Sequence, residues 1–201
     1  MVIVHHLENS RSQRILWLLE ELGIEYEIKQ YKRHPKTSLA PAELKAVHPL
    51  GKSPVITDSV NGELITVAES GAIVEYLLEQ YGPQFLPSND IASRNQYRYW
   101  LHFAEGSVTA SLVMKLIFGK TTERPVPFFI RPITKVVAAQ VGKGYLNPTI
   151  EAQLQHMDNA LAKTGWFVGD KLTGADFMMV FPCESAVASG IAGQYANIAK
   201  Y

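Results

Sequence analysis

The sequence predicts two domains of different class, an N-terminal α/β domain and an all-helical domain behind it. Through residues 1–82, hydrophobic residues switch between the period of two that strands show and the longer period of helices. Beyond residue 90 only helical spacing is found. The segment "GPQFLPSND" at 82–90 collects glycine, prolines and small polar residues, which are typical of a boundary. We therefore expect domains at 1–82 and 91–201, joined by a linker at 83–90.

The first domain begins with a β-α-β unit. The β-branched start "MVIVHH" predicts a strand at 2–6, and helical spacing from Ser12 predicts a helix that stops at Gly23. Alternating residues in "EYEIKQY", at 25–31, predict the second strand. If the two strands are parallel, their crossover should be right-handed.

A short helix, a hairpin and a longer helix complete this domain. The short helix can start at Pro41 and should end before Pro49, because the residue before proline avoids the helical region. The segments "SPVITD" and "GELITVA" are strand candidates joined by Asn61-Gly62, a strong hairpin signal. Helical spacing returns in "ESGAIVEYLLEQYG". The predicted order is β-α-β-α-β-β-α.

The second domain is expected to be a bundle of helices. Helical patterns cover 91–119, 124–142 and 148–163, and another helix opens within "LTGADF". Thr173 and Asp176 have the spacing of a capping box, with Leu172 and Phe177 as a hydrophobic staple around it.

Composition excludes several classes of protein. The chain balances 19 basic against 19 acidic side chains, whereas a nucleic-acid binder needs a basic excess. Cys183 is the only cysteine, which rules out an intrachain disulfide. We find no signal-peptide pattern and no apolar run of about 18 residues, the length of a membrane span. We expect a cytoplasmic protein that binds neither nucleic acid nor membrane.

Metal binding is not expected. His5 and His6 should point to opposite faces of their strand, so they make a poor pair of ligands. His102 fits a packed or surface position on a long helix. Cys183 fits a small buried hydrophobic residue.

The order of elements and four motifs together resemble the cytosolic glutathione transferase superfamily. The motifs are "ENSRSQR" after the first strand, "HPLGKSPVI" before the third, "AES" opening the third helix, and "LTGADF" in the helical domain. The resemblance covers essentially the whole chain, and "LENSRSQRILWLLEELG" and "RYWLHFAEGS" are most similar to bacterial and fungal members. It implies a thioredoxin-like first domain, a helical bundle, and an active-site loop of the serine type.

The resemblance implies a glutathione site along the first domain. In the family the proline matching Pro54 is cis and turns the backbone of Ser53 toward the cysteinyl part of glutathione, although only about 5% of X-Pro bonds are cis in general. Lys52 could meet the glycyl carboxylate as a point charge, with Lys36 as a second candidate. Both lysines also fit an ordinary solvated surface.

The residues Glu69 and Ser70 open a helix, where free N–H groups and the positive end of the dipole favour an anion. The resemblance implies that Ser70 takes the α-carboxylate of the γ-glutamyl group and that Glu69 takes its amine. The alternative is that both simply favour the start of a helix.

The loop after the first strand carries two serines with different expected roles. A thiol of pKa about 8.5 is mostly protonated at neutral pH, and a hydroxyl that donates to the sulfur favours the thiolate. When Arg14 is matched to the family's basic residue, Ser10 falls at the sulfur-contacting position and is the expected catalytic residue. Ser12 is expected to cap the helix, with a place in the glutathione site as the alternative. Asn9 could also donate to the sulfur.

The electrophile should bind between the domains, against residues 7–12 and the long helix. The candidate lining residues are Tyr99, Trp100, Phe103 and Ser107. Aromatic residues at helical spacing equally fit a packed core.

The resemblance implies a homodimeric transferase that joins glutathione, as co-substrate and without a permanent cofactor, to small hydrophobic electrophiles. A glutathione-dependent peroxidase and a non-catalytic ligand-binding or regulatory protein are the alternatives. Family members usually carry a further helix beyond a segment like "QYANIAKY", so we expect the helical domain to be either truncated or naturally short at Tyr201.

Overall fold

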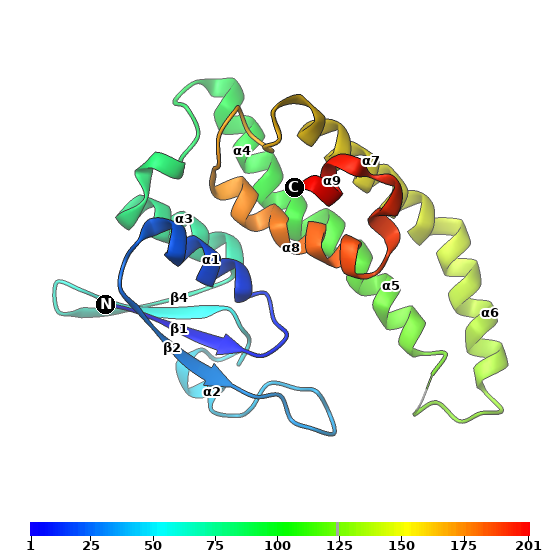
Figure 1. The fold of residues 1–201 in the computed structure, drawn as a ribbon. Coiled ribbons are helices and arrows are strands. Elements are labelled where there is room, and N and C mark those ends of the chain that lie inside the picture. Colours follow the sequence, from blue (N-terminus) through cyan, green and yellow to red (C-terminus); the bar gives the residue numbers. More distant parts are fainter. Residues whose placement is uncertain (124) are drawn as a thin grey trace.

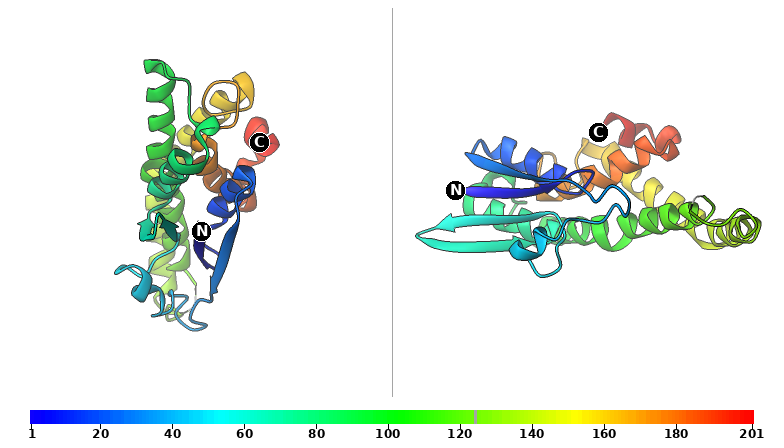
Figure 2. Two further views of the ribbon diagram at one scale, coloured as in Figure 1. Left: turned by 90° about the vertical axis from the view of Figure 1, so that its left-hand side faces the viewer. Right: turned by 90° about the horizontal axis from the view of Figure 1, so that it is seen from below.

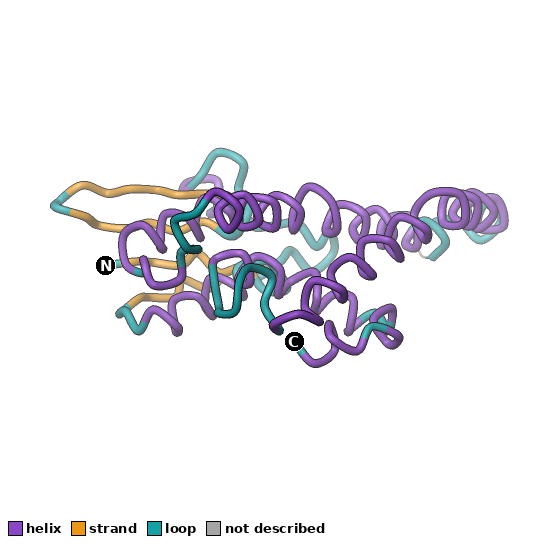
Figure 3. The backbone as a smooth tube through the Cα atoms, turned by 90° about the horizontal axis from the view of Figure 1, so that it is seen from above, coloured by secondary structure: helices purple, strands orange, loops and turns teal. Residues whose placement is uncertain are grey.

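The computed structural model describes residues 1–123 and 125–201. Strands lie in one part of the molecule, and helices with their connections make up the rest (Figure 1, Figure 3). The fold is a thioredoxin-like α/β domain followed by a helical bundle, as predicted.

The first domain contains a four-stranded mixed sheet with the expected order of elements. Its elements are β1 (Val2–Leu7), α1 (Gln13–Leu22), β2 (Tyr26–Tyr31), α2 (Leu44–Val47), β3 (Val55–Val60), β4 (Glu63–Ala68) and α3 (Ser70–Tyr81). The strands are arranged β2-β1-β3-β4. β1 and β2 are parallel, while β1–β3 and β3–β4 are antiparallel. Gly23 ends α1 in the left-handed conformation that glycine adopts easily.

The register brings three segments to one end of the sheet. Val4 pairs with Ile56, so the loop after β1 lies beside the residues that precede β3. Val55 pairs with Ala68, so the start of α3 lies at the same end. Sequence motifs that are far apart in the chain are therefore neighbours.

The two faces of the sheet are buried differently. On one face, Val2 and Val4 of β1 belong to the main core, which includes the apolar sides of α1 and α3 and continues into the helical domain. On the other face, Leu7, Tyr31 and Val55 form a smaller cluster with Leu44 of α2. Both faces of β1 are therefore covered, which fixes the strand beneath the loop that follows it.

Helices and their connections make up the second domain over the residues that the structure describes. Its elements are α4 (Ile91–Phe103), a π-helical turn (Ala104–Thr109), α5 (Ala110–Lys120), α6 (Arg131–Val141), a second π-helical turn (Gly142–Leu146), α7 (Asn147–Thr164), α8 (Gly174–Ala188) and α9 (Ala196–Lys200). The short 3₁₀ helices are Pro83–Phe85 and Ile191–Gln194. The helix expected from 124 begins at Arg131, and position 124 itself lies outside the described residues. The α5–α6 hairpin extends away from the sheet (Figure 1).

The central helix α8 ties the domains together. Its capping box is present, with the Thr173 N–H donating to Asp176 Oδ2 at 2.8 Å. The centroid of the Phe177 ring lies 4.5 Å from the ring centroid of Trp17 on α1 and 5.6 Å from that of Phe85. In both views of Figure 2 the helical domain lies against the first domain. The domains therefore share one continuous core.

One helix among the described residues, Ile91–Lys120, reaches the length and composition of a membrane span. This helix was not predicted as a span, because its apolar residues do not form an uninterrupted run in the sequence. Only 28% of its most apolar stretch is buried. Length and composition alone are a weak indication, because core helices of folded proteins meet the same criterion.

Candidate active site

Hydroxyl groups from two of the converging segments meet at the end of the sheet. Ser10 Oγ lies 2.7 Å from Ser12 Oγ and 3.5 Å from Ser53 Oγ. The Ser53 hydroxyl donates to the carbonyl oxygen of His5 at 2.9 Å, so its own proton is used within the sheet. Ser10 is half-buried, whereas Ser12 is completely buried. Of the two loop serines, Ser10 is thus the one that a ligand can approach.

Ser12 stands at the N-cap position of α1, but its hydroxyl does not cap the helix. Its backbone is already helical, and its side chain makes no capping hydrogen bond. The hydroxyl instead lies 2.9 Å from Nδ1 of His6 on β1. The prediction of a side-chain cap is therefore wrong: the buried hydroxyl is directed to the strand rather than to the first turn.

Asn9 occupies a turn held by Arg33. Its φ is +50°, a left-handed conformation that asparagine tolerates better than most residues. Nη2 of Arg33 donates to the Asn9 carbonyl at 3.0 Å, and Nε donates to the Glu8 carbonyl at 3.0 Å. The Asn9 side chain is exposed. Arg33 therefore fixes the backbone of the loop that presents Ser10.

The Ser53-Pro54 peptide bond is cis, as predicted. Pro54 is buried and Ser53 half-buried, while Lys52 is exposed just before them. Lys36, in the loop between β2 and α2, is also exposed. Both candidate lysines are thus open to solvent.

At the third segment, Glu69 precedes α3 with φ +76°, and Ser70 is the first residue of the helix. Glu69 is exposed and Ser70 is buried. Because the first turn of a helix carries unpaired N–H groups, this end favours a carboxylate. Ser70 therefore presents a donor-rich helix start at the same sheet edge as Ser53.

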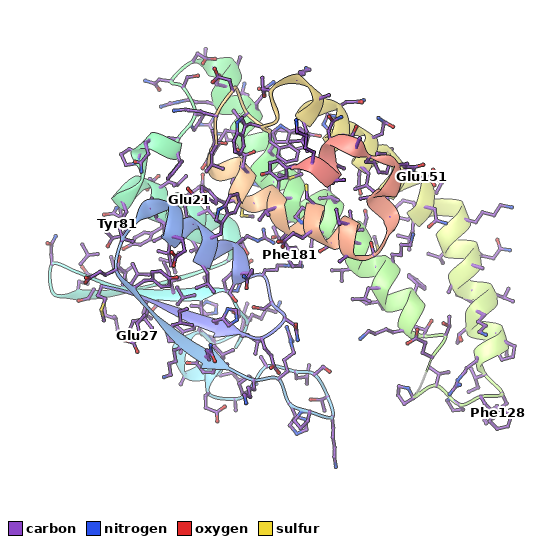
Figure 4. All side chains as sticks on the ribbon, viewed as in Figure 1. Glu21, Glu27, Tyr81, Phe128, Glu151 and Phe181 are labelled. Carbon is purple, nitrogen blue, oxygen red and sulfur yellow. The ribbon has the colours of Figure 1, made fainter. Side chains whose placement is uncertain are left out.

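An ion-pair cluster around the buried Arg14 joins the loop to the helical domain. Arg14 Nη1 lies 2.8 Å from Glu105 Oε1, and Arg11 Nη1 lies 3.0 Å from Glu105 Oε2. The Arg14 and Arg11 guanidinium carbons lie 4.9 and 5.8 Å from the centre of the Phe181 ring. Burial lowers the pKa of Arg14 to about 10, although Glu105 partly offsets the shift, so Arg14 stays charged at neutral pH. Figure 4 shows Phe181 at the boundary between the domains.

Sequence reasoning missed Arg11, Glu105 and Phe181. A usable signal existed for one half of the cluster: Arg14 falls on the apolar face of its helix, four residues before Leu18. A charge at such a position needs a buried partner. No periodicity connects that partner, Glu105, to α1.

The aromatic residues predicted to line the electrophile pocket pack against α7 instead. The rings of Tyr99, Trp100 and Phe103 contact one another and His156 of α7, and Trp100 also contacts Phe167. Ser107 accepts a hydrogen bond from Ser111 through its carbonyl oxygen. In this stretch it is Glu105 that meets the loop. The three rings lie on a different side of the helix from Glu105, because a helix turns about 100° per residue.

An apolar groove of about 610 Å³ runs from Phe181 along α5. Its lining includes Leu112 and Leu116 of α5, Ser185 of α8 and Ile191, with Lys115 and Lys120 also present. Because Phe181 also touches Arg11 and Arg14, the groove adjoins the cluster beside the Ser10 loop. Among the described residues, no group of three His, Cys, Asp or Glu side chains is placed to hold a metal.

Comparison with known proteins gives one consistent result. The family model described as glutathione S-transferase, N-terminal domain, matches residues 10–80, and that of the C-terminal domain matches 131–192. Glutathione S-transferase 3 of Schizosaccharomyces pombe is 38% identical over all of this chain and 81% of its own length. Glutathione S-transferase 1 of Saccharomyces cerevisiae is 35% identical over all of this chain and 88% of its own length.

A solved structure agrees with the sequence relatives. The crystal structure of a glutathione S-transferase from Actinobacillus pleuropneumoniae has 32% identity and a TM-score of 0.80. The match covers all of this chain and 85% of that one.

Proposed function

Because the chain belongs to the glutathione S-transferase family of enzymes, we propose that it joins the thiolate of glutathione to small hydrophobic electrophiles. The observation that supports this most strongly is the convergence of Ser10, Ser53 and Ser70 at one end of the sheet, fixed by the pairing of β1, β3 and β4. These segments offer separate partners along an extended ligand. Glutathione is a tripeptide with two carboxylates, an amine and a thiol, so its binding site needs a separate partner for each of these groups.

Each part of glutathione has a proposed partner. The γ-glutamyl carboxylate meets the Ser70 hydroxyl and amide at the helix start, and Glu69 takes the amine. The backbone of Ser53, before Pro54, pairs with the cysteinyl part. Lys52 meets the glycyl carboxylate, with Lys36 as the second candidate. Their exposure leaves them able to reach an anion.

Ser10 is the proposed catalytic residue. Its hydroxyl donates to the sulfur and thereby favours the thiolate, which is the nucleophile. The carbon of the electrophile then forms a bond to sulfur as its leaving group departs. Asn9 and Ser12 remain the alternative donors, although the burial of Ser12 favours Ser10.

The proposed electrophile site is the apolar groove beside Phe181. Its walls come mainly from α5 and α8, and it reaches the Arg11–Arg14–Glu105 cluster next to the Ser10 loop. This replaces the Tyr99-containing aromatic cluster as the candidate. We further propose a cytoplasmic homodimer in which the first domain of one subunit contacts the helical domain of the other.

The experiment that tests this function is turnover of a chromogenic aryl halide with glutathione. We expect Ser10→Ala to lower kcat/KM about 10- to 100-fold, since one hydrogen bond to a charged group contributes about 1.5–3 kcal/mol. Ser59→Ala is the matched control, because Ser59 is an exposed serine on β3. Unchanged activity in Ser10→Ala would exclude Ser10 and direct the test to Asn9→Ala and Ser12→Ala.

Two other outcomes would redirect the proposal. Glutathione binding without turnover of any electrophile in a panel would indicate a non-catalytic binding protein. Turnover confined to organic hydroperoxides would indicate a peroxidase that uses the same residues.

A further inference from the structure

A continuous chain of hydroxyls leads from the proposed thiol site to a histidine. Ser10 Oγ and Ser12 Oγ are 2.7 Å apart, and Ser12 Oγ and His6 Nδ1 are 2.9 Å apart. Both distances are those of good hydrogen bonds. Among the described residues, His6 has the only titratable side chain hydrogen-bonded to Ser10, Ser12 or Ser53. From these contacts we infer that His6 accepts the proton of the glutathione thiol through Ser12 and Ser10.

The inference explains why Ser12 is directed away from the helix. The hydroxyl oxygen of a serine at an N-cap position normally accepts a hydrogen bond from a backbone N–H of the first turn. Ser12 is completely buried and instead connects the Ser10 side chain of the loop to the His6 side chain of β1. Ser10 by contrast is half-buried and stands at the end of the chain that a ligand can approach. Ser10 is thus the accessible end of the chain, Ser12 is its buried link, and His6 is the base.

The transfer balances without any other reactant. In the starting state the thiol S–H faces Ser10 Oγ, the Ser10 O–H points to Ser12 Oγ, and the Ser12 O–H points to Nδ1 of a neutral imidazole. The S–H bond breaks as an O–H bond forms on Ser10, whose own proton passes to Ser12, and the Ser12 proton passes to His6. Sulfur keeps the electron pair, both serines remain neutral hydroxyls, and His6 becomes an imidazolium.

The same step turns every donor toward the sulfur. After transfer, His6 Nδ1–H donates to Ser12, Ser12 donates to Ser10, and Ser10 donates to the thiolate. Hydrogen bonds to an ionised acceptor are about twice as strong as neutral ones, so the product state is held by the reversed chain. His6 is half-buried, which leaves it able to return the proton to solvent.

Neighbouring groups do not compete for this role. Arg11 and Arg14 are paired with Glu105, so the carboxylate is already engaged by two cations. His5, on the other face of β1, lies 2.9 Å from the Tyr31 hydroxyl and 3.3 Å from Thr57 Oγ1. Ser53 uses its proton on the His5 carbonyl and cannot pass it on. His6 is a positioning residue in the sense that it acts on the sulfur only through the serines.

The direct test is the protonation state of His6 in the full-length protein, read by nitrogen NMR of labelled histidines. Because the inference rests on the proposed function, two ligands are compared: glutathione and S-methylglutathione, which has no thiol proton. We expect His6 to show imidazolium resonances with glutathione but not with S-methylglutathione. The His6→Asn variant assigns the signals.

Thiolate absorbance of bound glutathione gives the second readout. His6→Asn and Ser12→Ala should each raise the apparent pKa of the bound thiol by about one unit, which is about tenfold less thiolate at neutral pH. Both should leave the affinity for S-methylglutathione unchanged. His102→Asn is the matched control, since His102 is exposed on α4.

The outcomes separate this inference from the proposed function. If Ser10→Ala abolishes the thiolate signal while His6→Asn and Ser12→Ala titrate like the wild type, the relay is overturned and the sulfur contact stands. If Ser10→Ala also titrates like the wild type, both the relay and the role of Ser10 are overturned. If glutathione does not bind at all, the proposed function itself fails.

Discussion

At the residue scale, Arg14 shows how the domain boundary is held. Its side chain is fully buried, and Nη1 meets both Glu105 and, at 3.1 Å, the carbonyl oxygen of Met178. Burial lowers the pKa of Arg14 to about 10, which still leaves it charged at neutral pH. A buried charge that loses its partner strongly destabilises the folded state. Glu105 is therefore needed to keep Arg14 in place beside the loop.

We predict that Glu105→Ala lowers the free energy of unfolding by about 3 kcal/mol, because it leaves Arg14 unpaired in a buried position. Urea unfolding measures the change. Glu151→Ala provides the control, since Glu151 is an exposed glutamate on α7 and its loss should change stability by less than about 0.5 kcal/mol. Equal stability of the two variants would show that the ion pair contributes nothing to the fold.

The sequence could place Ser10 and Ser12 on the loop but not their hydroxyl contacts. The preference of serine for a helix start is local, so it predicts a cap from neighbouring residues alone. The hydroxyl of Ser12 instead contacts His6, which belongs to the strand that precedes the loop. Likewise, Arg14 and Glu105 are 91 positions apart, and only the packed domains bring them together.

At the scale of elements, Asp58 connects β3 to α3 and to the N-terminus. It is buried, accepts hydrogen bonds from Tyr76 and Tyr81, and lies 3.3 Å from the N-terminal ammonium. Burial alone would raise the pKa of this carboxyl, but Tyr81, Tyr76 and the ammonium together lower it below its usual range. The folded state therefore favours the ionised form more than the unfolded state does.

This shift predicts a loss of stability in acid. Because the folded-state pKa is depressed, the stabilisation is fully present above the unfolded pKa, near 4, and is lost as the pH falls through the folded value. Replacing Tyr76 and Tyr81 together by Phe should lower the free energy of unfolding by about 2 kcal/mol at pH 7, and by less at pH 3. Urea unfolding at the two pH values measures this difference.

The matched control for the tyrosine pair is Tyr145→Phe, because Tyr145 is 57% exposed. It should have the acid sensitivity of the wild type. A double variant that loses as much stability in acid as the wild type would mean that the tyrosines do not set the ionisation of Asp58.

Elements with local signals were predictable, and those set by packing were not. The Asn61-Gly62 hairpin, the stop at Gly23 and the Thr173 capping box all depend on residues within one turn of each other. The start of α6 has no such signal and lies later than expected. Packing against α7 and α8 decides which residues of α4 and the following turn meet the loop, so the aromatic residues predicted to line the pocket contact α7 instead.

At the scale of the whole molecule, apolar side chains remain exposed on both domains. On the helical domain they gather on the projecting α5–α6 hairpin, where Phe128 is 79% and Ile133 66% exposed, and Figure 4 shows Phe128 at its tip. On the first domain, Leu64 is 69% exposed on β4, the edge strand of the sheet. Exposed apolar side chains gathered on one hairpin mark an interaction site, and Leu64 adds a single exposed side chain on an unpaired strand edge. These two surfaces fit the proposed homodimer, in which the hairpin of one subunit covers the β4 edge of the other.

The dimer predicts that either surface, when made charged, weakens self-association. Leu64→Lys and Ile133→Lys should each raise the dimer dissociation constant at least about tenfold, since burying one such side chain contributes about 1.5–3 kcal/mol. Sedimentation velocity over a concentration series measures the constant, and Val187→Lys, at a 49% exposed position on α8, is the control. If only Ile133→Lys acts, the hairpins pair with each other and β4 is free. A wild-type chain that stays monomeric at every concentration would leave both surfaces uncovered by a second copy and contradict the homodimer.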